Sequence, residues 1–428
     1  MTHVAPAAGL RGDLAVPGDK SISHRALLLA AIAEGESEIR GFGRSADTLS
    51  TAGALRALGV EVRDEEEIVR VTGVGLRGLR APASAIDCGN AGTLMRLLPG
   101  ILAGQAGRFE LAGDESLSRR PLERIAEPLR LMGARVDTAD GHAPLLVEGG
   151  LLSPIRYELP VASAQVKSCV LLAGLYAGRG PTVVTEPAPT RDHTERMLEA
   201  SGARVRREPL TARIWPAERL RPLSLEVPGD FSSAAPFLVA ATLLPGSEVR
   251  VHGIGVNPTR IGFLHVLERM GARISIYRRR TASGEPVADL EVASAELVAT
   301  AIGPEEVPLL IDELPLFALA ASMAHGQSVV RGARELRVKE TDRIETVTNA
   351  LKAVGAHVQA TYDGFRVRGV PSRPQGGGVV DSAGDHRVAM LGAIAGLVSR
   401  EGVEIQGAEC VAVSFPRFFE TLELLSVR

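Results

Sequence analysis

One phrase recurs five times along the chain and limits the folds that it can adopt. Each copy starts at a leucine, reaches a glycine four residues later and continues into a short β-like segment: residues 55–62, 129–136, 198–205, 267–274 and 351–358. The glycines at 59, 133, 202, 271 and 355 are 74, 69, 69 and 84 residues apart. A helix that closes on a left-handed glycine and leads into a strand has this pattern. The chain is therefore predicted to repeat a helix–strand unit.

A second phrase marks where the units start. Val-Pro-Gly-Asp at residues 16–19 returns at residues 227–230, and both copies lead into an alanine-rich apolar stretch. Looser versions begin near Asp87, Pro160, Asp312 and Asp381. Six starts predict six α/β units in two sets of three. The last unit would end in a helix at residues 418–425 without a following strand, so we expect an N-terminal strand at about residues 8–16 to complete it.

Composition argues against several classes of function. At 428 residues the chain exceeds a typical single core, so two domains are expected. The 48 basic and 51 acidic residues leave no basic excess for nucleic acid, and one Trp with four Tyr offers few surfaces for stacking bases. The longest uncharged runs, at residues 231–247 and 314–330, contain proline and polar residues, so no membrane span is expected.

The histidines and cysteines do not have the spacing of a metal site. The nine histidines include no His-x-His or His-x-x-x-His pair, and Cys88, Cys169 and Cys410 are far apart. An odd number of scattered cysteines is typical of reduced thiols in a cytosolic protein. Asp13 and Lys20 precede any long apolar run, which argues against a signal peptide. We therefore expect a cytoplasmic protein without a metal.

Charged and polar residues gather at the starts of the units. They include Lys20, Ser21, Arg25, Arg119, Arg120, Ser163, Gln165, Arg191 and Arg387. Six helix N-termini around one cleft would attract anions, and cations in a first helical turn oppose the helix dipole unless an anion compensates them. Other interpretations remain open: a solvated N-cap at residues 18–20, a tight turn at residues 89–93, and N-capping or paired carboxylates acting as a base at Asp312 and Glu313.

Residues 337–343 are the most informative charged segment of the chain. Three cations and two carboxylates occupy seven positions: Arg337, Lys339, Glu340, Asp342 and Arg343. If the segment is helical, Lys339 and Arg343 share a face, with Glu340 between them along the chain. Two cations beside a carboxylate suit a multiply charged anion that gains or loses a proton. A charged helix face with internal ion pairs would have the same sequence.

These loops, in this order, resemble the 5-enolpyruvylshikimate-3-phosphate (EPSP) synthase family over essentially the whole chain. The class II branch is matched by Gly-Asp-Lys at 18–20, Ser-Ala-Gln-x-Lys at 163–167, Arg-x-His-x-Glu at 191–195 and Asn-x-Thr-Arg at 257–260. The resemblance implies an α/β (α+β) fold, a two-domain inverse α/β barrel of six βαβαββ repeats in two sets of three. Residues 1–19 and 229–428 would form the domain that holds both termini, and residues 20–228 the second, with the active site in the interdomain cleft.

The resemblance also implies a reaction of the shikimate pathway, which leads to chorismate and the aromatic amino acids. The enolpyruvyl group of phosphoenolpyruvate would pass to the 5-hydroxyl of shikimate 3-phosphate with release of phosphate, without metal or organic cofactor, in a monomer. Shikimate 3-phosphate would contact Lys20, Ser21, Arg25, Ser163, Ala164, Gln165, Arg191, Asp312 and Lys339. Phosphoenolpyruvate would contact Lys20, Gly92, Arg120, Gln165, Arg343 and Arg387.

The resemblance implies catalytic roles for three residues. Asp312 would take the proton of the 5-hydroxyl, Glu340 would protonate the methylene carbon, and Lys20 would act as ligand and proton shuttle. The positive charges of the seven matched cations would be balanced only when both substrates are bound. These cations are Lys20, Arg25, Arg120, Arg191, Lys339, Arg343 and Arg387.

The chain departs from the family pattern at two positions, and each departure fits class II but removes one expected ligand. A lysine that many members place before Ser/Thr-Phe-Pro is Val413 here, and the class I asparagine before Arg-Val-Lys-Glu is Glu335. Some glyphosate-insensitive class II members have alanine at the position of Gly92. A related transferase that acts on a UDP-sugar uses a loop cysteine, and no cysteine here lies in such a motif. A binding paralogue without catalysis would not need Asp312, Glu340 and Lys20 together.

Overall fold

The computed structural model describes residues 1–428, and the chain divides into two compact units. Unit 1 consists of Met1–Pro17, Gly229–Arg280 and Pro286–Arg428. Unit 2 consists of Gly18–Pro228 and the short segment Thr281–Glu285. Unit 2 therefore contains five residues that are distant in sequence from the rest of it.

Unit 2 is built from three four-stranded sheets of one topology. Its strands are β3 (Glu34–Arg40), β4 (Glu61–Asp64), β5 (Ile68–Val74), β6 (Ile86–Asp87), β7 (Arg108–Ala112), β8 (Arg135–Ala139), β9 (His142–Glu148), β10 (Arg156–Glu158), β11 (Thr182–Thr185), β12 (Val205–Glu208), β13 (Thr211–Ile214) and β14 (Ser224–Glu226). The strand orders are β14-β3-β5-β4, β6-β7-β9-β8 and β10-β11-β13-β12. In each sheet the first pair is parallel and the other two pairs are antiparallel. The repeated topology fits the repeated units of the sequence.

Unit 1 repeats this plan with variations. Its strands are β1 (Thr2–Val4), β2 (Gly9–Ala15), β15 (Glu248–Gly255), β16 (Arg273–Ala282), β17 (Glu285–Ala293), β18 (Ala301–Ile302), β19 (Gln327–Val330), β20 (His357–Thr361), β21 (Gly364–Arg368), β22 (Val379–Asp381), β23 (Val403–Gln406) and β24 (Ser426–Val427). They form the sheets β18-β19-β21-β20, β16-β17-β15-β2-β24 and β1-β23-β22. The tip of the β16–β17 hairpin is the segment that belongs to unit 2.

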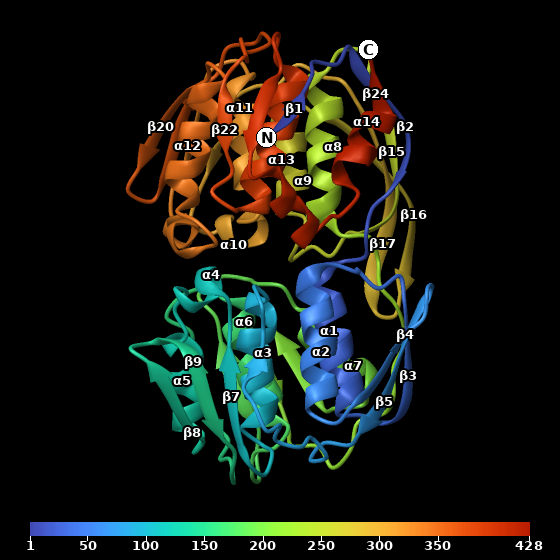
Figure 1. Ribbon diagram of the computed structural model, residues 1–428, viewed down its shortest axis with the longest axis vertical. Helices are drawn as coiled ribbons and strands as arrows, with labels where there is room; N and C mark the ends of the chain where they lie inside the picture. The colour runs from blue at the N-terminus through green and yellow to red at the C-terminus, as the bar shows by residue number, and fades with distance from the viewer. The chain divides into compact units, whose positions relative to one another are not determined.

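The helices of each unit fall into a central and a peripheral set. In unit 2 they are α1 (Lys20–Ala31), α2 (Ala46–Ala57), α3 (Gly92–Leu102), α4 (Glu115–Ser118), α5 (Glu123–Leu131), α6 (Ala164–Gly174) and α7 (His193–Ala200). In unit 1 they are α8 (Phe231–Leu243), α9 (Gly262–Arg269), α10 (Val307–Leu310), α11 (Leu314–Ser322), α12 (Arg343–Ala353), α13 (His386–Val398) and α14 (Phe418–Leu425), with short 3₁₀ helices η1 (Arg334–Val338) and η2 (Ala408–Val413). Figure 1 shows α8, α11 and α13 packed together in unit 1.

The central helices are α1, α3 and α6 in unit 2 and α8, α11 and α13 in unit 1. They are apolar on nearly every side, which is why they are buried. In unit 2, α3 packs against both α1 and α6, and almost every residue of the three is inaccessible. Four of the six central helices begin at a polar residue whose side chain accepts a backbone N–H: Asp19, Ser163, Asp230 and Asp385. The chain thus enters each buried helix from a polar turn, and these turns contain most of the predicted site residues.

All five recurrent glycines have the predicted conformation. Their φ angles lie between +87° and +104°, at the end of α2, α5, α7, α9 and α12 and before β4, β8, β12, β16 and β20. The helix predicted at residues 418–425 is also confirmed as α14. The expectation that no strand follows it is wrong, because β24 comes next and pairs with β2. The strand expected at residues 8–16 is present as β2, but it does not complete the last unit: β2 pairs with β15, and β1 pairs with β23 of the last unit.

No helix combines the length and the apolar sequence needed to cross a membrane.

Candidate active site

The start of α1 holds three of the predicted ligands of shikimate 3-phosphate. Asp19 is buried and accepts the N–H of Ile22, so the N-cap is not exposed to solvent. Lys20 is the first residue of the helix, and its Nζ donates to Asp47 Oδ2 at 2.9 Å. A carboxylate of α2 therefore compensates this cation at the positive end of the helix dipole.

Arg25 lies one turn further along α1 and is held on all sides. Its Nε donates to Thr194 Oγ1 at 2.7 Å, Nη1 to the Ser21 carbonyl at 2.9 Å and Nη2 to Ser168 Oγ at 3.0 Å. Burial, with a smaller contribution from Arg191, lowers the pKa of Arg25 to about 10. The guanidinium remains a cation at neutral pH, in a fixed orientation.

Further predicted residues of unit 2 converge on this helix start and on α3. Arg191 Nη1 donates to Ser21 Oγ at 3.4 Å. Ser163 caps α6, which begins at Ala164, and Gln165 Nε2 donates to Thr93 Oγ1 of α3 at 3.2 Å. The structure thus brings the Ser-Ala-Gln segment next to the residue that follows Gly92.

Gly92 and Arg120, both predicted to contact phosphoenolpyruvate, are in close contact. A Cβ atom at Gly92 would lie 2.7 Å from Nη1 of Arg120 and 2.9 Å from Nη1 of Arg96. Arg96 was not predicted as a site residue; it is buried and donates to the carbonyls of Gly92 and Pro121 at 3.1 and 3.2 Å. A side chain at this position would therefore displace at least one of the two guanidinium groups.

In unit 1, Arg343 is surrounded by three carboxylates. Its Nε donates to Asp385 at 2.7 Å, its Nη2 to Glu340 at 2.5 Å, and its Nη1 lies 3.6 Å from Asp312. The side chain of Arg343 is 1% exposed. Burial alone would lower the pKa of Arg343, but Asp385 and Glu340 outweigh burial and raise it. Glu340 and Asp312, the predicted acid and base, therefore both lie beside the guanidinium of Arg343, which stays charged.

The conditional prediction of a helix through residues 337–343 is wrong. The 3₁₀ helix η1 ends at Val338, Lys339 is extended, and α12 starts at Arg343. Asp342 caps α12 by accepting the N–H groups of Ile344 and Glu345. Lys339 and Arg343 therefore do not lie on one face of a helix, although Glu340 and Arg343 still form an ion pair.

The two adjacent carboxylates at 312 and 313 have different main partners. Glu313 is fully buried and accepts two N–H groups of Arg260, at 2.8 and 2.9 Å. It does not cap α11 through its side chain, so neither N-capping nor a carboxylate pair describes it. Asp312 instead lies 3.6 Å from both Arg343 and Arg387. Arg387 also lies 3.8 Å from Glu313, but only Asp312 of the two carboxylates is in an ion pair with Arg343 as well.

Comparison with known proteins shows the family to which this chain belongs. A family model described as EPSP synthase (3-phosphoshikimate 1-carboxyvinyltransferase) matches residues 4–422. The 3-phosphoshikimate 1-carboxyvinyltransferase of Acidithiobacillus ferrooxidans is 52% identical over 97% of this chain and 95% of its own length. That of Methylococcus capsulatus is 50% identical over 99% and 96%.

The chain belongs to the EPSP synthase family.

Solved structures of EPSP synthases have the same fold. The enzyme of Acinetobacter baumannii superposes with a TM-score of 0.88 at 44% identity, covering 99% of this chain and 98% of that one. The enolpyruvyl transferase NikO from Streptomyces tendae has a TM-score of 0.80 at 19% identity, covering 99% of this chain and 96% of that one, and supports the fold alone. The predicted two-domain inverse α/β fold and the predicted enzyme class, a transferase, are therefore confirmed.

The family motifs predicted the cations and Glu340 but not Asp47 and Asp385, two further carboxylates that compensate them. Lys20 pairs with Asp47, and Arg343 pairs with Asp385 and Glu340. The expectation that the cations are balanced only by substrates is therefore wrong. Asp385 could have been noticed as the N-cap in Gly-Asp-His-Arg, whereas Asp47 carries no local signal.

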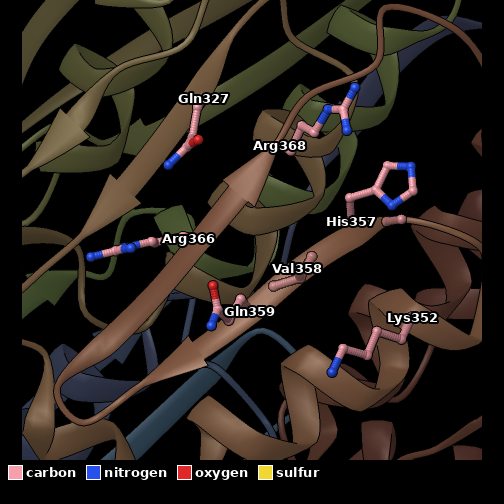
Figure 2. A pocket seen from close by; sticks show the side chains of 8 residues that line it. Gln327, Lys352, His357, Val358, Gln359, Arg366 and Arg368 are labelled. Atoms are coloured by element: carbon pink, nitrogen blue, oxygen red, sulfur yellow. The ribbon is translucent and has the colours of Figure 1, made fainter.

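One surface pocket lies apart from all of these residues. It has a volume of about 470 Å³ and lies on the exposed face of the β19-β21-β20 sheet, lined by Gln327, Lys352, His357, Gln359, Arg366 and Arg368 among others (Figure 2). None of the predicted site residues lines it. Across residues 1–428, no group of three or more His, Cys, Asp or Glu side chains is arranged to hold a metal ion.

Proposed function

We propose that this chain carries out the family's reaction on phosphoenolpyruvate and shikimate 3-phosphate. The enolpyruvyl group passes to the 5-hydroxyl of shikimate 3-phosphate, and inorganic phosphate is released. The observation that carries the proposal is the arrangement at Arg343. One buried guanidinium holds Glu340 by a hydrogen bond and lies 3.6 Å from Asp312, so an acid and a base stand beside a cation that suits an anionic substrate.

The reaction proceeds by addition and then elimination. Glu340 donates a proton to the methylene carbon of phosphoenolpyruvate, which makes the adjacent carbon electrophilic. The 5-hydroxyl oxygen adds to that carbon while Asp312 accepts the hydroxyl proton. The resulting tetrahedral ketal phosphate loses a proton from its methyl group and expels phosphate, which restores the double bond. Lys20, paired with Asp47, binds both substrates and relays protons.

Arginines hold the anionic groups of the substrates because a planar guanidinium can bind phosphate or carboxylate through two hydrogen bonds. Shikimate 3-phosphate binds the α1 start, the Ser-Ala-Gln segment and Arg191 of unit 2, together with Asp312 and Lys339 of unit 1. Phosphoenolpyruvate binds Lys20, Gly92, Arg120 and Gln165 of unit 2, together with Arg343 and Arg387 of unit 1. Each substrate takes ligands from both units, so both units are needed for the reaction.

A single chain acts as a monomer in the cytoplasm. This is supported by the residue assignments, which need no second copy, and by three free cysteines, which suit a reducing compartment. Sedimentation of the purified protein at micromolar concentration is expected to give the mass of one chain, 45.1 kDa.

The deciding experiment measures phosphate release from phosphoenolpyruvate. One reaction contains shikimate 3-phosphate and a parallel one contains a UDP-sugar, with no acceptor as the control. We expect release only with shikimate 3-phosphate. Release with the UDP-sugar alone would assign the chain to the other enolpyruvyl transfer, and no release with either acceptor would refute the proposal.

A further inference from the structure

Lys167 is a buried cation to which the proposed reaction assigns no role. It lies in the first turn of α6, and its side chain is 3% exposed. Its Nζ has acceptors in Glu195 at 2.8 Å, in Glu186 at 3.1 Å and in the carbonyl of Thr190 at 3.3 Å. An ammonium group has three N–H donors, so these contacts use all of them. They join α6 to the first turn of α7 and to the segment between β11 and α7.

The residues beside this cluster are the predicted ligands of shikimate 3-phosphate. Thr190 is held twice, since its hydroxyl also donates to Glu186 at 2.5 Å, and it directly precedes Arg191. Ser163, Ala164 and Gln165 lie within one turn before Lys167 on the same helix.

Arg25 depends on the same elements. Ser168 and Thr194, which hold its guanidinium, are the sequence neighbours of Lys167 and Glu195, and the two hydroxyls are 2.7 Å apart. A shift of α6 against α7 would therefore disturb the positions of Arg25 and Arg191 together.

Buried carboxylates compensate the buried cations of this region. Burial alone would lower the pKa of Lys167, but Glu195 and Glu186 outweigh burial and raise it. Arg25 and Lys167 give two buried cations, and Glu186 and Glu195 give two buried carboxylates. Since breaking one such contact leaves an uncompensated buried charge, the geometry is strongly enforced.

We propose that Lys167, Glu186 and Glu195 are positioning residues, which fix α6 and α7 so that Arg25 and Arg191 are already oriented when shikimate 3-phosphate arrives. The inference rests on the proposed function, because it takes these two arginines as ligands of that substrate. Orientation before binding lowers the cost of ordering side chains around a ligand. The cluster would therefore affect the affinity for shikimate 3-phosphate more than the affinity for phosphoenolpyruvate.

The test is Glu195→Gln, which keeps the size of the side chain and removes one charge from the cluster. Titration calorimetry is expected to give a Kd for shikimate 3-phosphate raised roughly tenfold, a change equivalent to about 1.4 kcal/mol. In the steady state, the KM for shikimate 3-phosphate should rise in parallel, with the KM for phosphoenolpyruvate and kcat within about twofold of wild type. A purely structural ion cluster would not separate the two substrates in this way.

The matched control is Leu198→Ala on the same helix, a fully buried apolar residue outside the cluster. It should lower the melting temperature at least as much as Glu195→Gln and leave the Kd for shikimate 3-phosphate unchanged. An equal rise in Kd in both variants, or a wild-type Kd in Glu195→Gln, would overturn the inference.

A milder variant, Thr190→Val, covers the case in which Glu195→Gln does not fold. It removes only the hydroxyl that donates to Glu186 and should raise the Kd severalfold. A wild-type Kd in Thr190→Val would then overturn the inference. If the wild-type protein binds no shikimate 3-phosphate, the proposed function and this inference fail together. Wild-type binding that both variants retain overturns the inference alone.

Discussion

Three carboxylates share the guanidinium of Arg343, and one of them is the proposed acid. Glu340 accepts a hydrogen bond from Arg343 Nη2, and its side chain is 17% exposed, so it is anchored but can still reach a ligand. A group that must deliver a proton needs this orientation as much as a suitable pKa. The chemistry at this position can be tested without removing the contact to Arg343.

Glu340→Gln keeps an oxygen that can accept from Arg343 but removes the transferable proton. We expect kcat to fall at least about a hundredfold, with the Kd for shikimate 3-phosphate within about twofold of wild type, because general acid catalysis typically contributes that much. Steady-state kinetics and calorimetry give the two values. Glu345→Gln, an exposed glutamate in the first turn of α12, is the control and should be unaffected. Wild-type turnover in Glu340→Gln would remove Glu340 from the mechanism.

Gly92 is constrained by two arginines and not by its own backbone. In Gly92→Ala the new methyl group would lie 2.7 Å from Arg120 Nη1, so this guanidinium must move. Because small displacements of a substrate-binding group are costly, we expect the KM for phosphoenolpyruvate to rise roughly tenfold and the KM for shikimate 3-phosphate to change little.

Gly53→Ala on α2 is the control for this substitution, since a methyl group there meets nothing within 4 Å. It should leave both KM values unchanged. An unchanged KM for phosphoenolpyruvate in Gly92→Ala would show that Arg120 can move without loss, which argues against its assignment as a ligand.

At the scale of single residues, the sequence predicted the cations, Asp312 and Glu340 but missed two of the carboxylate partners. Lys20, Arg25 and Arg343 stand in motifs that can be recognised in one dimension. Asp47 is 27 residues from Lys20, and Asp385 is 42 residues from Arg343. These pairs depend on packing between helices, which no local pattern reports.

Between elements, the contact of α1 with α2 contains a buried histidine. His24 Nδ1 lies 2.6 Å from Thr51 Oγ1, and the residue is inaccessible to solvent. Burial, assisted by Lys20 and Arg25 and opposed by Asp47, lowers the pKa of His24 to about 3. The imidazole is therefore neutral in the folded protein at every pH at which the enzyme would work.

This shift makes the stability of the fold depend on pH. The unfolded chain binds a proton at His24 near pH 6.5 and the folded chain does not until about pH 3, so the free energy of unfolding falls as pH decreases through this window. Between pH 7 and pH 5 we expect the wild type to lose about 2 kcal/mol more than His24→Gln. Denaturant unfolding at both pH values measures the difference. Equal losses in the two proteins would show that His24 does not carry the effect.

The elements themselves were predictable where their signals are local. Each recurrent glycine ends a helix because glycine has no Cβ and adopts the left-handed conformation without a steric penalty, and all five were placed correctly. The α12 start was misread because Asp342 was counted as one more charge, although it acts as the N-cap. The strand β24 has two residues and exists through its pairing with β2, which lies at the other end of the chain.

At the scale of the whole molecule, the short second segment of unit 2 is held to the rest of the unit by buried and exposed contacts. Glu285 Oε1 lies 2.8 Å from His193 Nδ1, and both side chains are 2% exposed. Arg196 Nη1 also donates to the carbonyl of Gly284, and the N–H of Glu226 donates to Ser283 Oγ. Residues 281–285 are thus tied to α7 and to the end of β14.

Glu285→Ala should destabilise α7 locally. Loss of a buried hydrogen-bond partner costs about 1–3 kcal/mol, so amide hydrogen exchange in α7 should accelerate roughly tenfold or more. Glu291→Ala, on the exposed side of β17, should have almost no effect. Unchanged exchange in α7 would mean that the contact does not stabilise this helix.

Residues 281–285 lie between two segments of unit 1 in the sequence but belong to unit 2, so they also limit where the chain can be cut into fragments. A fragment made from Gly18–Pro228 would contain the three sheets and the helices α1–α7 but not the carboxylate that meets His193. In this fragment the imidazole of His193 would lose its hydrogen-bond partner, and the space that residues 281–285 fill would be open. Isolating this half of the molecule as an independently folding piece would therefore require grafting a five-residue peptide from another part of the gene onto it.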